Sequence, residues 1–179
     1  MTEIISSYFS GDVLLLKHKV HADQRGSFIK IFNQDAFSEL KLNTYWVDEY
    51  TSWSHKNVLR GMHLQTGPFK HYKLVTCMKG NALDVVIDLR SGSASYGEYA
   101  CFELDSGQNQ SVYIAPGFAH GFLSRTMDTL MHYKVSTTHS PEYDTGIRWD
   151  SFNFDWGAKD IILSSRDKQL SPMVEFENV

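Results

Sequence analysis

The chain has 179 residues, a net charge of −4 at pH 7 and a pI near 6.0. This balance gives no basic footprint for nucleic acid or an anionic membrane, so we expect neither as a partner. Two cysteines make no disulfide framework, no apolar run approaches the roughly 20 residues that span a bilayer, and the first residues lack a signal-peptide pattern. These features predict one cytoplasmic domain over residues 1–179.

Short segments rich in Val, Ile, Leu, Tyr and Thr alternate with turn residues, which predicts strands. In chain order the segments are 12–20, 71–78, 82–89, 97–104, 111–115 and 129–136. Helical pattern is thin, and residues 34–42 are the one good short candidate. Only residues 79–81 separate two of the strands, which suggests a hairpin. Many short strands at this spacing predict an antiparallel sandwich or barrel.

A barrel can gather polar side chains from strands that are far apart in sequence. Residues two apart on a strand point to the same face. His63 therefore shares a face with Gln65, while Lys73 and Tyr133 each share one with apolar neighbours. Such groups can converge inside the mouth of a barrel.

Two stretches hold the densest chemistry. In residues 58–65, Arg60 and His63 stand three apart among strand-forming residues and can hold an anion and a base near one another. In residues 115–122, a Pro-Gly pair and a second glycine predict a tight turn that carries His120.

Each candidate also has an ordinary interpretation. A histidine or tyrosine of a half-buried strand, such as Tyr133, is more often structural than catalytic. Taken alone, Lys73 and Arg25 are expected to be solvated charges. Asp167 lies in the polar run 164–168, where an aspartate commonly caps a turn.

A metal centre is the first sharp alternative. A barrel with His63 at a strand end and His120 after a Pro-Gly turn is similar to the cupin pattern for Fe, Mn or Zn. That pattern needs a His-x-His pair and a following Glu, but Gln65 stands at the second position and no Glu occurs before Asn81. The ligand set is incomplete, so we expect no metal.

A series of short motifs runs through nearly the whole chain in fixed order and spacing. The motifs are residues 23–28, 58–65, 73–75, 80, 84–90, 96–97, 116–122, 133–134, 146–149 and 163–167. Together they resemble the dTDP-4-dehydrorhamnose 3,5-epimerase family. The resemblance implies an all-β, metal-free cupin-type double-stranded β-helix (jelly roll) with a few short peripheral helices, assembled as a homodimer.

The resemblance also implies an activity. It predicts an isomerase without cofactors that epimerises a nucleotide-linked 4-keto-6-deoxyhexose at C3, C5 or both, in deoxysugar biosynthesis such as that of rhamnose for cell-surface polysaccharides. By resemblance, His63 is the base, Asp167 the carboxylate that orients it, Tyr133 the acid on the opposite sugar face, and Lys73 the cation beside the C4 oxygen. Contacts to substrate are expected from Arg25, Phe28, Lys30, Glu49, Tyr50, Arg60, Gln65, His120 and Arg166.

These roles agree with elementary chemistry. A proton beside a ketone becomes removable only if the enolate oxygen is stabilised, and a fixed cation such as Lys73 does this. Histidine is the side chain that accepts and releases protons near neutral pH. Inversion requires reprotonation from the other face of the ring, so the base and the acid must be separate groups.

The departures from the family pattern fall among the binding residues. Lys30 stands where the family usually has Glu, residues 48–50 replace Gln-Asp-Asn, residues 138–139 replace a pair of Tyr, and Arg166 replaces Lys. Neutral drift or a different specificity explains them equally well. They leave open a single-site C3 or C5 epimerase and a nucleotide other than dTDP. A sugar-nucleotide 3,4-ketoisomerase and a non-catalytic sugar-binding barrel are the remaining alternatives.

Overall fold

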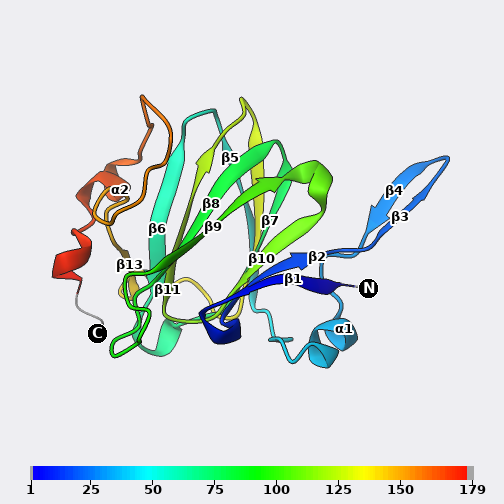
Figure 1. Ribbon diagram of the computed structural model, residues 1–179, viewed down its shortest axis with the longest axis horizontal. Helices are drawn as coiled ribbons and strands as arrows, with labels where there is room; N and C mark the ends of the chain where they lie inside the picture. Colours follow the sequence, from blue (N-terminus) through cyan, green and yellow to red (C-terminus); the bar gives the residue numbers. More distant parts are fainter. Residues whose placement is uncertain (1, 177–179) are drawn as a thin grey trace.

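The computed structural model describes residues 2–176 of the chain. In this part of the chain, two antiparallel sheets pack face to face (Figure 1). The larger sheet has the strand order β1 (Glu3–Tyr8), β2 (Val13–Lys17), β10 (Gln110–Ile114), β7 (Lys73–Lys79), β12 (Thr129–Val135) and β5 (Asp48–Ser54). The second sheet has the order β13 (Asp144–Gly146), β6 (Leu59–Gln65), β11 (Phe118–Ser124), β8 (Asn81–Asp88) and β9 (Tyr99–Asp105). The architecture is a double-sheet jelly roll, which confirms the predicted all-β class.

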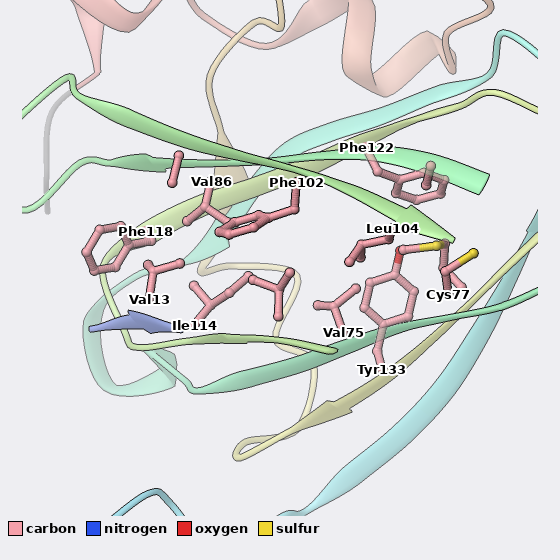
Figure 2. Close-up of a cluster of buried hydrophobic side chains, with 14 of the residues drawn as sticks. Val13, Val75, Cys77, Val86, Phe102, Leu104, Ile114, Phe118, Phe122 and Tyr133 are labelled. Atoms are coloured by element: carbon pink, nitrogen blue, oxygen red, sulfur yellow. The ribbon is translucent and has the colours of Figure 1, made fainter. Parts of the chain in front are cut away.

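The inner faces of the two sheets enclose an apolar core, shown in Figure 2. Val75 and Tyr133 enter it from the larger sheet, and Val86, Phe102 and Phe122 enter from the other. Burial alternates along β9, where every second residue is buried. This period of two is the pattern of a strand with one face on the core, and it explains why the sequence predicts β7, β8, β9, β10 and β12. The strands β1, β4, β5, β11 and β13 were not among the predicted segments.

The outer faces of both sheets are also partly covered. Helix α1 (Gln34–Glu39) places the buried Phe37 against Leu14, Leu16 and Leu74 on the outside of the larger sheet. Asn33 caps this helix by accepting a hydrogen bond from the backbone N–H of Ala36.

On the second sheet, the chain that follows β13 packs Trp156 and its neighbours against Leu59 and Leu123. This segment contains α2 (Ser165–Gln169) and the 3₁₀ turn η4 (Met173–Glu175), and α2 lies beside β6 (Figure 1). The remaining 3₁₀ turns are η1 (Phe9–Gly11), η2 (Gly67–Phe69) and η3 (Ser106–Gln108).

A two-stranded hairpin stands apart from both sheets. It consists of β3 (Val20–Asp23) and β4 (Gly26–Ile29), and it projects from the barrel on the side of the N-terminus (Figure 1). Nearly every residue of the hairpin is exposed.

Four local predictions differ from the structure. The turn at residues 79–81 does not make a hairpin, because β7 and β8 belong to different sheets and the chain crosses between them at Gly80. Residues 12–20 are two strands, not one, since β2 ends at Lys17 and β3 begins at Val20.

The other two differences concern candidate site residues. The predicted turn around His120 ends at Gly117, and β11 begins at Phe118, so His120 lies on a strand. Asp167 lies in helix α2 and not in a loop, because Ser164 caps the helix and supplies its first hydrogen-bond acceptor. No helix among residues 2–176 is both long and apolar enough to span a membrane.

Candidate active site

A pocket of about 540 Å³ opens at one end of the barrel, between the two sheets. Its volume lies within the range of small-molecule sites. Side chains from β5, β6, β7, β11, β12 and α2 line it, so segments from most of the chain meet there. The pocket brings together nine of the predicted site residues, Tyr50, Arg60, His63, Gln65, Lys73, His120, Tyr133, Arg166 and Asp167.

Glycines allow the two strands beneath the pocket to approach closely. A Cβ atom on Gly61 of β6 would lie 2.4 Å from the Cα atom of Gly121 on β11, which is far inside van der Waals contact. Gly61 also has a φ of +132°, a conformation that side-chain-bearing residues rarely adopt. The close pairing sets His63 directly opposite His120 in the register of the two strands.

His63 forms a short hydrogen bond with Asp167. The Nε2 atom of His63 lies 2.6 Å from Oδ1 of Asp167, and the two residues are 104 positions apart in the chain. The His63 side chain is 26% exposed, whereas that of Asp167 is 4% exposed. With Nε2 held by the carboxylate, Nδ1 is the nitrogen that can take a proton from a ligand.

The environment keeps Asp167 ionised. Burial alone would raise the pKa of its carboxyl group, but hydrogen bonds from His63 and from Ser164 outweigh this and lower the pKa below its ordinary value. An ionised carboxylate at Nε2 stabilises the imidazolium that forms when Nδ1 accepts a proton.

Lys73 lies on β7, and its buried ammonium group binds the backbone of β6. Its Nζ atom donates a hydrogen bond to the backbone carbonyl of His63 over 2.9 Å, and the residue is 7% exposed. Burial lowers the pKa of Lys73 to about 8, while the negative charges of Asp144 and Asp84 oppose this shift. The ammonium group is therefore charged at neutral pH and poorly hydrated, so it can stabilise negative charge in the pocket strongly.

Tyr133 points from β12 into the barrel, beside Val75 and Cys77 (Figure 2). It is 7% exposed. Burial raises the pKa of its phenol well above the ordinary value, with the neighbouring Ser52 hydroxyl opposing the shift. The phenol is therefore protonated at neutral pH and is able to donate its proton.

His120 forms a second pair with a carboxylate. Its Nε2 atom lies 2.7 Å from Oδ2 of Asp84, and both side chains are almost fully buried. The imidazole also meets the ring of Tyr133 edge to face, with centroids 6.2 Å apart.

The remaining predicted residues of the pocket are held by protein contacts. The guanidinium of Arg60 donates to Ser54 and to the backbone carbonyl of Trp53. Arg166 forms an ion pair with Asp144 at 2.8 Å. Gln65 is buried, and its amide bonds to backbone groups of Thr138 and Ser140, so it fastens the segment after β12 to β6.

Four predicted contact residues lie outside the pocket of their own chain. Glu49 points to the outer face of the larger sheet, where it accepts hydrogen bonds from His132 and Lys134. Arg25 is bound to Asp23 on the β3–β4 hairpin. Phe28 on the same hairpin is 62% exposed, and Lys30, just after it, is also exposed.

Sequence reasoning missed two acidic residues of the site. Asp84 stands between apolar residues in the middle of β8, and a charge inside such a run signals a buried partner. Asp144 binds both Arg166 and His139 at the pocket mouth. Its position two residues before Gly146 gives no comparable signal. Among residues 2–176, no three His, Cys, Asp or Glu side chains gather as a ligand set for a metal ion.

The jelly roll and the pocket in its mouth define a cupin-type barrel with a small-molecule site. The family model for dTDP-4-dehydrorhamnose 3,5-epimerase matches residues 10–175. The chain therefore belongs to the dTDP-4-dehydrorhamnose 3,5-epimerase family, a family of carbohydrate isomerases, and both the predicted family and the cupin-type fold are confirmed.

Individual relatives are similar to this chain over most of their length. The chain is 39% identical over 168 residues to the dTDP-4-dehydrorhamnose 3,5-epimerase of Escherichia coli (strain K12), covering 92% of this chain and 91% of the relative. The epimerase structure from Legionella pneumophila Philadelphia 1, in complex with dTDP-4-keto-L-rhamnose, superposes with a TM-score of 0.93 at 27% identity, covering 99% of this chain and 95% of that one.

A relative described as a monoepimerase is also similar. The 3'-monoepimerase of Streptomyces bikiniensis, in complex with dTDP-quinovose, gives a TM-score of 0.88 at 26% identity, covering 95% of this chain and 88% of that one. The family fold thus occurs in an enzyme described as acting on one carbon as well as in those described as 3,5-epimerases.

Proposed function

We propose that this protein epimerises a nucleotide-linked 4-keto-6-deoxyhexose at C3, C5 or both, as one step of deoxysugar biosynthesis. The observation that carries the proposal is the lining of one pocket by the His63–Asp167 pair, Lys73 and Tyr133. The relatives support it, since the E. coli and L. pneumophila proteins are described as epimerases of such sugars.

The first step breaks a C–H bond next to the C4 ketone. Nδ1 of His63 takes the proton, and the electron pair of the bond moves into an enolate. Asp167 stabilises the resulting imidazolium, and the ammonium of Lys73 stabilises the negative oxygen. A positioned base of this kind contributes about 10²–10⁴-fold to the rate.

The second step forms a new C–H bond on the opposite face. The phenol of Tyr133 gives its proton to the carbon, the enolate returns to the ketone, and the configuration is inverted. Solvent then restores the proton of Tyr133 and removes that of His63. Nothing is oxidised or reduced, so the cycle needs no redox cofactor.

Cationic and polar groups around the pocket suit a nucleoside diphosphate. Arg60 and Arg166 carry guanidinium groups, whose paired donors match phosphate oxygens. In the proposal both contact the diphosphate, while His120 contacts the sugar. Arg166 would exchange its contact with Asp144 for one with the ligand.

The hairpin residues suggest a homodimer in solution. The resemblance assigns Arg25, Phe28 and Lys30 to the substrate, yet the hairpin projects from the barrel of its own chain (Figure 1). A second copy of the chain would receive the hairpin at its pocket and cover the exposed Phe28. In this proposal each chain is a single catalytic domain, and the enzyme works in the cytoplasm, where sugar nucleotides are made.

The test offers 4-keto-6-deoxyglucose, linked to dTDP or to other nucleoside diphosphates, to the protein in D₂O. Proton NMR is expected to show deuterium at C3, C5 or both, together with the epimerised sugar. Hydrogen moved between C3 and C4 would identify a ketoisomerase instead. No incorporation with any substrate would leave a non-catalytic sugar-binding barrel.

Epimerisation at a single carbon is the second candidate. The similarity to the 3'-monoepimerase of Streptomyces bikiniensis makes it a candidate, and Asp48, Tyr50 and His139, at positions that depart from the family pattern, line the pocket where a change of specificity would act. The same spectrum decides, because one labelled carbon identifies a monoepimerase and two identify a 3,5-epimerase.

A further inference from the structure

Tyr50 lies face to face with Tyr133 inside the pocket. The two residues are direct partners in the antiparallel pairing of β5 and β12. Their rings stack with centroids 4.9 Å apart and planes inclined by 17°.

The two aromatic neighbours of Tyr133, His120 and Tyr50, differ in how firmly they are held. His120 meets one side of the ring and is itself fixed by the buried Asp84. Tyr50 stacks on the same ring from β5, the edge strand of its sheet, and is 47% exposed. Of these two aromatic neighbours of Tyr133, Tyr50 is therefore the one that solvent reaches.

Both phenols are neutral at the pH of the cell. Burial raises the pKa of Tyr50 to about 12, and the carboxylates of Asp144 and Asp48 add to the shift. Burial chiefly raises the pKa of Tyr133 too, and the nearby Tyr50 contributes to it. The stack thus joins two uncharged rings, an arrangement that orients aromatic side chains.

We propose that Tyr50 is a positioning residue, which holds the Tyr133 ring so that its proton reaches the enolate before the base returns the one it removed. The inference rests on the proposed function, in which Tyr133 is the acid. Without the stack, Tyr133 turns within its half of the pocket, and a displacement of about 1 Å is enough to slow a transfer by about 10²-fold. Proton removal by His63 does not depend on the stack.

Loss of the stack is expected to change the ratio in which the enolate forms labelled substrate or inverted product. After proton removal, the imidazole exchanges its proton with D₂O. Each enolate then either takes a deuteron on the original face, which gives labelled substrate, or is protonated on the other face, which gives inverted product. Loss of positioning lowers the number of inversions per exchange. Simple damage to the fold lowers exchange and inversion together, so the ratio distinguishes the two.

The experiment measures this ratio by proton NMR, with a 4-keto-6-deoxy sugar nucleotide that the wild type converts. Tyr50→Ala is expected to lower the number of inversions per exchange about tenfold or more, measured at saturating substrate so that weaker binding does not alter the ratio. Tyr50→Phe keeps the stacking face and is expected to restore the ratio. Thr51→Ala is the matched control, because Thr51 is the next residue of the same strand and points to the opposite face.

Three results would overturn the inference. An unchanged ratio in Tyr50→Ala would show that the stack has no positioning role. A loss of inversion in Tyr50→Phe as large as in Tyr50→Ala would assign the effect to the Tyr50 hydroxyl, as a proton donor in its own right. If Tyr50→Ala does not fold, Tyr50→Leu takes its place, and an unchanged ratio there counts equally against the inference. Absence of exchange in the wild type with every substrate would instead refute the proposed function itself.

Discussion

Two histidine–carboxylate pairs lie on neighbouring strands of this barrel, and they differ in how far solvent reaches the histidine. His63 and His120 face one another on β6 and β11, and each has its Nε2 atom on an aspartate at a short distance. The His63 side chain is 26% exposed, while that of His120 is 5% exposed. The partly exposed His63–Asp167 pair can therefore exchange protons with a ligand, whereas the buried His120–Asp84 pair holds a side chain of the pocket in place.

The two carboxylates also reach their histidines by different routes. Asp84 comes from β8, the strand adjacent to β11, so pairing of these two strands is enough to bring Asp84 to His120. Asp167 comes from helix α2, which follows the chain that covers the outside of the same sheet. The His63 pair thus depends on the docking of the last part of the chain, and the His120 pair does not.

The largest expected effect comes from the carboxylate of the accessible pair. Asp167→Asn removes the negative charge that stabilises the His63 imidazolium, so the rate of epimerisation is expected to fall by about 10²–10⁴-fold. Asp84→Asn, the same change in the enclosed pair, is expected to cost much less in rate. Initial rates of the two folded variants check this difference. Equal losses of rate would show that solvent exposure of the histidine does not distinguish the roles of the two pairs.

The next effect falls on the acid. Tyr133→Phe keeps the ring but lacks the proton, so inversion is expected to drop by about 10²-fold or more, whereas deuterium exchange continues. The measurement compares label in recovered substrate with label in product. Loss of exchange and inversion together would assign Tyr133 another role.

The enclosed pair should matter most for stability. His120→Ala removes the partner of the buried Asp84 Oδ2, and Oδ1 already has no hydrogen-bond partner among the described residues. The expected cost is about 3–5 kcal/mol in the free energy of unfolding. His63→Ala should cost less, because Asp167 keeps its contact with Ser164. Chemical denaturation of both variants measures the difference, and a larger cost at His63 would reverse the comparison.

The smallest predicted effect is a pH dependence. Burial lowers the pKa of Lys73 to about 8, so the ammonium is present below this pH and is lost above it. The rate is therefore expected to fall as pH rises through about 8, by up to about tenfold per unit. A rate that stays level to pH 10 would show that enolate stabilisation does not need the Lys73 charge.

The sequence predicted the strands well wherever alternation of apolar residues was strong, as in β9 and β12. It placed a hairpin at residues 79–81, because a short turn looks the same whether the chain returns to its own sheet or crosses to the other. His120 was expected in a tight turn, because a Pro-Gly pair precedes it and Gly121 follows it. Gly121 is instead the point where β11 packs closely on β6.

Among site residues, those named by motif mostly meet in one pocket, but their contacts were not predictable. Glu49 and Tyr50 are neighbours in sequence, yet they lie on opposite faces of β5. The register of β5 against β12 decides this, and one residue of shift exchanges the two faces. The stack of Tyr50 on Tyr133 follows from that register and from no local pattern.

The central claim is that the accessible imidazole, His63, removes the proton from the sugar. The most direct test follows deuterium entry at C3 and C5 with the His63→Asn variant in D₂O, once binding of the substrate to that variant has been verified. We expect no label above the rate without enzyme. Label at the rate of the wild type would contradict the claim.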